Sequence, residues 1–154
     1  MRLIRDQKEG SAITRVLEQA YNHGLLSKCK TRPVGAIILE KGRMVGRGYT
    51  QPQNPENCCV FINNDKNCRA IDAHLICLQD YLERTQQSQS YGTVIYSVSI
   101  NPNGGRPMTP HRDVMVSQRL LDAGIEKIVP WSKQLREYDM IEYHNLCAEF
   151  YKRL

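Results

Sequence analysis

Hydrophobic and polar residues recur along the chain with two periods, and each period predicts a different element. Across residues 11–24 the apolar positions fall three and four residues apart, which is helical spacing, and Gly24 stands where helices commonly end. Two β-rich runs near 34–40 and 43–49 flank the polar stretch "EKGR". This pattern predicts two strands joined by a tight hairpin.

Farther along the chain, helical and strand patterns alternate. The stretch "AIDAHLICLQDYLER" predicts a helix over roughly 72–85 that is apolar on most sides and therefore packs against a sheet. A third strand ("TVIYSVSI"), a third helix ("HRDVMVSQRLLDAG"), a fourth strand ("IEKIVPW") and a C-terminal helix at about 137–152 follow. The order α-β-β-α-β-α-β-α predicts an α/β fold in which helices cover both faces of a mixed central sheet, in one domain spanning 1–154.

One segment of the chain has no period at all. Residues 51–68 are rich in Asn, Pro and Cys, and 18 residues is long for a loop in a compact domain. Such a loop indicates either a functional role or a metal that ties it down.

Composition narrows the class of protein. The hydrophobic fraction of 41% and the charged fraction of 24% are ordinary for a soluble globular protein. The longest apolar runs are too short to cross a bilayer, and the first residues lack the apolar core of a signal peptide, so we expect a soluble intracellular protein without a membrane partner. Six irregularly spaced cysteines then indicate thiols or metal ligands rather than a disulfide framework. The net charge of +5 permits a nucleotide or nucleic-acid partner, but no arginine-rich run marks a nucleic-acid groove.

Three local matches, combined with the element order, resemble the cytidine/deoxycytidylate deaminase superfamily. The first is "SKCKTRPVGAIILEKGRMVGRGYTQP" (27–52), similar to the family segment with Ser-x-Cys, Val-Gly-Ala, a hairpin and Gly-Tyr-Asn. The second is a Cys-containing loop that leads into a helix where the family carries its zinc motif. The third is "TVIYSVSINP…LLDAGIEKIVPW", similar to the family's strand, metal loop, helix and strand. The resemblance covers about residues 11–131 and implies a three-layer α-β-α fold.

The sequence departs from the family at the positions that carry its chemistry. A zinc deaminase needs a His or Cys ligand followed by Ala and a Glu acid/base, and a Pro-Cys-x-x-Cys at the next helix. Here the first motif aligns with Asp72-Ala73-His74. Counting back from Gly124 places Asp113 and Val116 at the thiolate positions, and a longer-loop alignment places Asn103 near the first of them. Val116 has no donor atom, so we expect no catalytic zinc.

Three functions remain open after this loss. The first is a catalytically inactive deaminase-like protein kept for binding a nucleotide or nucleic acid, or as a subunit of an assembly. The second is an atypical nucleotide deaminase or other nucleotide-modifying enzyme with a rebuilt site made of Asp72, His74, His111 and Asp113. The third is a purely structural component of a complex. Family members commonly assemble, so the resemblance also implies a homo- or hetero-oligomer.

Each candidate residue also has a plain structural interpretation. Asp72 and Asp113 precede helical runs and are favoured N-caps, and His74 is either a buried structural histidine or a cavity residue. Arg112 near a helix N-terminus either holds a phosphate or lies in solvent. Tyr49-Thr50 stands where the family has Tyr-Asn, whose Asn contacts the nucleotide; the resemblance therefore makes both residues nucleotide-binding candidates.

The cysteines offer one further hypothesis. Some deoxycytidylate-deaminase-like proteins hold a structural zinc with a Cys from the early segment and others from the long loop. The corresponding residues here are Cys29, Cys58, Cys59 and Cys68. Four thiolates in a tetrahedron would fix the long loop; the alternative is that they are small buried residues.

Overall fold

The computed structural model describes residues 11–52, 70–88 and 92–152. The helices are α1 (Ser11–Gly24), α2 (Ala73–Thr85), α3 (Val114–Asp122) and α4 (Met140–Lys152). The strands are β1 (Val34–Glu40), β2 (Arg43–Tyr49), β3 (Gln51–Pro52), β4 (Ala70–Ile71), β5 (Thr93–Ile100), β6 (Pro107–Met108), β7 (Lys127–Pro130) and β8 (Tyr138–Asp139).

The predicted long elements are present, and the differences lie at their ends. The hairpin of β1 and β2 has the predicted bounds and turns at Lys41 and Gly42, which both have positive φ. The C-terminal helix begins at Met140 rather than near 137, because the two preceding residues pair with β7 as a short strand. The third helix begins at Val114 rather than 111, because Asp113 is its N-cap. The two-residue strands β3, β4, β6 and β8 were not predicted, since runs this short leave no period to read.

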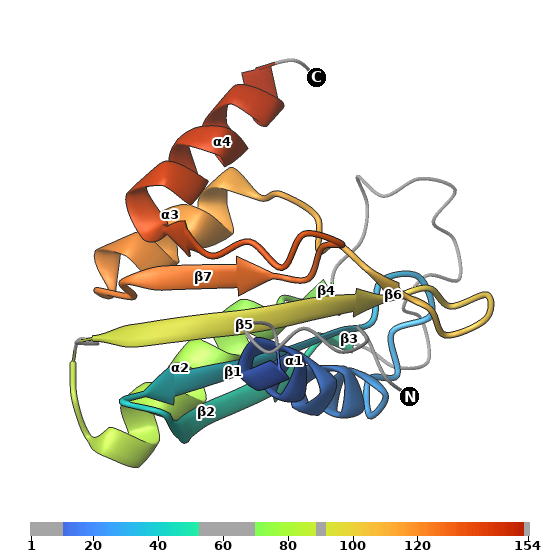
Figure 1. Cartoon of the computed structure of the whole chain (residues 1–154), viewed down its shortest axis with the longest axis horizontal. Coiled ribbons are helices and arrows are strands. Elements are labelled where there is room, and N and C mark those ends of the chain that lie inside the picture. The colour runs from blue at the N-terminus through green and yellow to red at the C-terminus, as the bar shows by residue number, and fades with distance from the viewer. Residues whose placement is uncertain (1–10, 53–69, 89–91, 153–154) are drawn as a thin grey trace.

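The central sheet is mixed, as predicted. Its strand order is β2-β1-β5-β7-β8, with β6 pairing at the end of β5. Only the β5–β7 pair is parallel; β1 pairs antiparallel with β2 and β5, and β7 with β8. The strand β5 runs through the middle of this arrangement (Figure 1).

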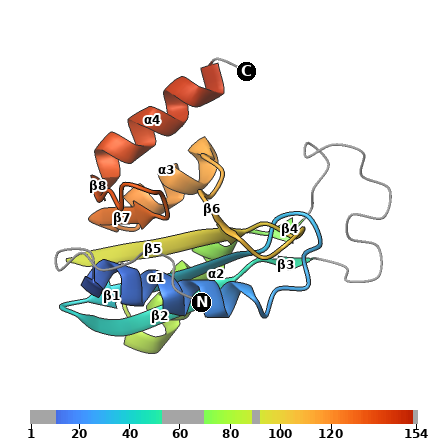
Figure 2. The same cartoon turned by 45° about the vertical axis from the view of Figure 1, so that its right-hand side comes forward.

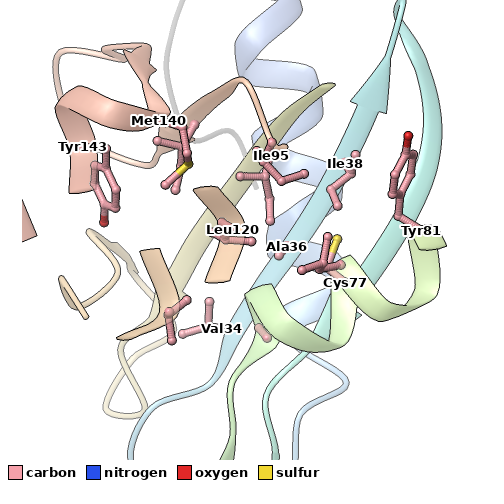
Figure 3. Packing of buried hydrophobic residues seen from close by; sticks show 14 of the residues in the cluster. Val34, Ala36, Ile38, Cys77, Tyr81, Ile95, Leu120, Met140 and Tyr143 are labelled. Carbon is pink, nitrogen blue, oxygen red and sulfur yellow. The ribbon is translucent and has the colours of Figure 1, made fainter. Parts of the chain in front are cut away.

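Helices cover both faces of the sheet. α1 lies on one face and α2 on the other, and α4 leans on α3 beyond the sheet (Figures 1 and 2). Alternate residues of β1 divide the core: Ile37 packs with Val98 toward α1, whereas Ala36 and Ile38 pack with Cys77 on the α2 face. Figure 3 shows this second cluster extending from α2 across β5 to α3 and α4. The three-layer α-β-α architecture is therefore confirmed.

Two glycines let the helices sit directly on the strands. A Cβ on Gly35 would lie 1.7 Å from the carbonyl oxygen of Ala20 in α1. A Cβ on Gly48 would lie 2.6 Å from the backbone nitrogen of Cys77 in α2. The close contact at Gly48 holds α2 against β2. The first turn of α2 therefore lies at the end of the sheet where β1 starts and β5 ends. Within the described ranges, no helix is both long and apolar enough to cross a membrane.

Candidate functional site

The head of α2 is built around one carboxylate oxygen of Asp72. This Oδ1 accepts hydrogen bonds from the backbone N–H groups of His74 at 2.7 Å and Leu75 at 3.4 Å, so Asp72 is the N-cap of the helix. The same oxygen lies 2.9 Å from Nδ1 of the His74 ring. Asp72 therefore performs the structural task expected of it and also holds a neighbouring side chain.

The pairing with Asp72 settles the orientation of the His74 ring. An ionised carboxylate only accepts hydrogen bonds, so Nδ1 of His74 carries a proton, and Nε2 is the ring nitrogen that Asp72 does not engage. The His74 side chain is only 7% exposed, and Nε2 has no hydrogen-bond partner among the described residues. His74 is thus a buried, oriented histidine with one nitrogen still available.

The environment of Asp72 favours its ionised form. Burial opposes ionisation, but the charge of the His74 ring and the hydrogen bonds from His74 and Leu75 outweigh it, so the pKa of Asp72 lies below its usual value. The Asp72 side chain keeps 33% of its surface exposed. A negative charge beside His74 is therefore a stable feature of this helix head.

The head of α3 repeats the capping arrangement. Oδ1 of Asp113 accepts from the backbone N–H groups of Met115 at 2.9 Å and Val116 at 3.1 Å. Val116 itself is buried in the core on the α2 face of the sheet. His111, just before the cap, packs edge-on against Phe150 of α4 with ring centroids 5.7 Å apart.

Thr50 lies at the same end of the sheet, but its hydroxyl is already engaged. Its Oγ1 accepts from the N–H of Val34 at 3.1 Å, and the residue is 5% exposed. The Thr50 carbonyl accepts from the hydroxyl of Ser27. Thr50 thus joins the segment before β1 to the end of β2.

These helix heads and strand ends enclose a cavity of about 550 Å³. It is lined by all four residues proposed for a rebuilt site, the two caps and both histidines. The lining residues are Thr31, Arg32, Val34, Thr50, Ala70, Asp72, His74, Ser99, Met108, Thr109, Pro110, His111 and Asp113. A volume of this size is typical of small-molecule sites. We refer to it below as the helix-head cavity.

A smaller cavity of about 330 Å³ adjoins it, since Thr109 lines both. Its lining consists of Thr109, Arg112, Pro130, Ser132, Gln134, Arg136, Tyr138 and Tyr143, and none of these is an Asp or Glu. Arg136 is occupied, because it donates to Glu142 at 2.7 Å and stacks on Tyr138 at 4.5 Å. Arg112 is half-buried and has no ion pair within the described part of the chain. We call this the Arg112 cavity.

Burial and charge both affect the pKa of Tyr143, which lines the Arg112 cavity. Burial is the main cause that raises the pKa of Tyr143, and the positive charge of Arg112 opposes that rise. Tyr143 therefore stays protonated and presents a neutral phenol to the cavity. Arg112 is then the unneutralised charge among the lining residues of this cavity that the structure describes.

Tyr49 is not brought to the helix-head cavity. It lines a third cavity of about 530 Å³, together with His23, Arg47, Asp80 and Arg84. There the Asp80 carboxylate accepts from the backbone N–H of Arg47 at 3.0 Å and from Nε of Arg84. Burial, followed by the charges of Arg47 and Arg84, lowers the pKa of His23.

The proposed structural zinc set is only partly within the described residues. Cys29 is buried, and its Sγ accepts from the N–H of Arg32 at 3.4 Å and lies 3.8 Å from Oγ1 of Thr31. Cys58, Cys59 and Cys68 lie outside the described residues. Cys77 and Cys147 are buried in the core.

The helix heads do not fit the zinc ion that the resemblance implies. Val116 offers no donor atom, and Asp72 and Asp113, each with one oxygen already capping a helix, offer hard carboxylate oxygens where the family's zinc has nitrogen or thiolate ligands. No group of three or more His, Cys, Asp or Glu side chains is placed to hold a metal anywhere in 11–52, 70–88 and 92–152. We therefore derive no chemical step through a metal at this site.

Several lining residues were not singled out from the sequence. Arg32, Ser99 and Thr109 line the helix-head cavity, and Ser132 and Gln134 line the Arg112 cavity. Ser99 was read only as part of a strand, and the others fall in loops without a period. Alternation along β5 was a usable signal, because Ile95 and Ser99 lie an even number of positions apart and so share a face.

Comparison with known proteins addresses the fold. No family model matches the chain, and no curated protein sequence matches it. Among solved structures it is similar to the dCMP deaminase from the cyanophage S-TIM5 in its apo form, with a TM-score of 0.52 and 18% identity over 79% of this chain and 82% of that one. It is also similar to the cytidine deaminase from Mycobacterium tuberculosis, with a TM-score of 0.51 and 15% identity over 89% of this chain and 94% of that one. The chain therefore has the cytidine-deaminase-like α/β fold.

Proposed function

We propose that this chain is a non-catalytic protein of the deaminase-like fold that binds a nucleotide across the helix-head cavity and the Arg112 cavity. One observation carries the proposal: the side chains at the two helix heads are engaged in capping and pairing, while the space that they surround remains open at about 550 Å³.

The two cavities suit two different parts of a nucleotide, the base and the phosphate. A planar polar ring suits the helix-head cavity, where the free Nε2 of His74 and the exposed His111 ring offer hydrogen bonds. An anionic phosphate suits the Arg112 cavity, where an unpaired guanidinium lies beside hydroxyl and amide groups and no described carboxylate competes. The resemblance to nucleotide deaminases supports the same class of ligand.

Titration calorimetry with nucleosides and their 5′-monophosphates tests this proposal. We expect the monophosphate of the preferred base to bind on the order of tenfold more tightly than its nucleoside, because Arg112 adds a charge-assisted contact. Arg112→Ala should abolish that difference, and His74→Ala should weaken both ligands. Lys133→Ala, which removes an exposed charge outside the cavity lining, is the matched control. Failure of all nucleotides to bind, or binding that neither variant changes, contradicts the proposal.

A second candidate is an enzyme with a rebuilt site, and the Asp72–His74 pair favours it. A carboxylate that fixes Nδ1–H leaves Nε2 as a base, which is the arrangement general-base histidines use. Ammonia release from a nucleotide, lost in His74→Ala, would support this candidate over the binding protein.

A further inference from the structure

A cavity of about 990 Å³ lies away from the helix-head cavity, between α4 and the segment that joins α3 to β7. Its apolar lining comes from Leu121, Ile125, Met140, Ile141 and Leu146. Ile141 is the most exposed of these, at 65%. We call this feature the α4 groove.

Acidic residues surround the α4 groove. The acidic lining residues are Glu126, Asp139, Glu142 and Glu149, and no Lys, Arg or His is among the described lining residues. The chain as a whole carries a net charge of +5, so this acidic groove has the opposite sign of charge from the whole chain. Glu142 is partly neutralised by Arg136 at 2.7 Å. Glu126 and Glu149 have no ion pair with any described residue.

The position of α4 leaves the groove accessible. α4 packs mainly against α3 and projects past the edge of the sheet (Figures 1 and 2). Its inner side is held by Met140, Tyr143 and Cys147, which are buried. Ile141 and Glu149, by contrast, are both exposed.

We infer that the α4 groove binds a basic amphipathic helix of another protein. Amphipathic helices place a row of large apolar side chains into grooves of this kind, and lysines or arginines beside that row would face Glu126 and Glu149. An acidic or uncharged helix would gain no electrostatic attraction from these carboxylates, and they would repel a small anion. This interaction surface is independent of the nucleotide proposal, because the groove shares no lining residue with the helix-head or Arg112 cavities.

Fluorescence anisotropy with a labelled 18-residue Leu/Lys amphipathic peptide tests the inference, with a Leu/Glu peptide of the same apolar pattern as its twin. The full chain should bind the basic peptide and not the acidic one. Ile141→Ala should weaken binding on the order of tenfold, since it removes the most exposed apolar side chain of the groove. Glu126→Gln with Glu149→Gln should weaken it and flatten its salt dependence. Glu18→Gln with Glu40→Gln removes two charges outside the groove and should change nothing.

Two further measurements separate the groove from generic attraction of basic peptides. Panning a displayed library of random 18-residue peptides on the wild type, with the double glutamine variant as counter-selection, should enrich basic amphipathic sequences. Enrichment of neutral or acidic sequences, or none, overturns the inference. Sedimentation velocity should give the same mass for the wild type and Ile141→Ala. An oligomer that dissociates in Ile141→Ala would mean that a second copy of the chain occupies the groove, and this result also overturns the inference. Equal binding of the Leu/Lys peptide to wild type and Ile141→Ala has the same consequence.

Discussion

One oxygen of Asp72 receives both the backbone N–H of His74, at 2.7 Å, and the ring Nδ1 of the same residue, at 2.9 Å. A helix cap and a side-chain orientation are therefore made by a single atom. This arrangement explains how an Asp and a His can stand side by side at the head of an apolar helix. It is also why replacing the carboxylate has consequences for both stability and ligand binding.

Removing the cap at Asp72 should destabilise the fold. We expect Asp72→Ala to lower the free energy of unfolding by about 1 kcal/mol, the usual value for an N-cap, measured by urea denaturation at pH 7. Asp72→Asn keeps a capping oxygen and should cost less. Asp122→Asn, at an exposed carboxylate near the end of α3, is the control and should be nearly neutral. Equal stability of Asp72→Ala and wild type would contradict the capping role.

The lowered pKa of Asp72 also predicts a pH dependence. A carboxylate with a depressed pKa in the folded state stabilises the protein fully above its unfolded pKa of about 4, and the stabilisation is lost as pH falls through the folded value. The difference in unfolding free energy between wild type and Asp72→Asn should therefore be constant above about pH 5 and shrink below pH 4. A difference that grows on acidification would have the wrong sign for this account.

A second side-chain pair, Ser117 and the half-buried His144, joins α3 to α4. The Ser117 hydroxyl donates to the carbonyl of Val114 at 3.0 Å, so its oxygen accepts from Nδ1 of His144 at 2.8 Å. Ser117→Ala should lower the free energy of unfolding by about 1–2 kcal/mol, because it leaves the ring N–H without a partner. Hydrogen exchange should show faster opening of α4 in particular. Ser132→Ala, in a loop, is the control; unchanged exchange in α4 would mean that the pair does not hold the helices together.

Two core thiols should be unreactive in the folded protein. Cys77 and Cys147 are both fully buried, and burial raises the pKa of each thiol, that of Cys77 well above its usual value. Since the thiolate is the reactive form, iodoacetamide at pH 8 should leave both unmodified until denaturant is added. Peptide mapping by mass spectrometry measures this directly. Labelling of native Cys77 within minutes would show that α2 does not pack as described.

Sequence alone was sufficient for the long elements and for the caps. Repeating apolar spacing revealed the four helices and the larger strands, and Asp72 and Asp113 were recognised as caps because each immediately precedes a helical run. The short strands β6 and β8 could not be predicted, because two residues show no period and each strand is defined only by its backbone pairing with β5 or β7.

The site was harder to anticipate than the fold. Spacing could not show that Thr50 uses its hydroxyl on Val34, or that Tyr49 lies in a different cavity, because both follow from the path of the backbone around β2. The Arg112 cavity unites loop, strand and helix residues from three separate segments, which no local pattern connects. The charge of Arg112 was visible in the sequence, but its lack of a partner was not.

The most direct test of the central claim is ammonia release by the purified, zinc-supplemented chain from cytidine, deoxycytidine, adenosine and their 5′-monophosphates. We predict no release above the buffer blank for any of them, even where calorimetry detects binding, because Val116 offers no donor atom and no group of three or more described His, Cys, Asp or Glu side chains is placed to hold a hydrolytic metal. Sustained ammonia release that is abolished by His74→Ala and unaffected by Lys133→Ala would contradict the claim.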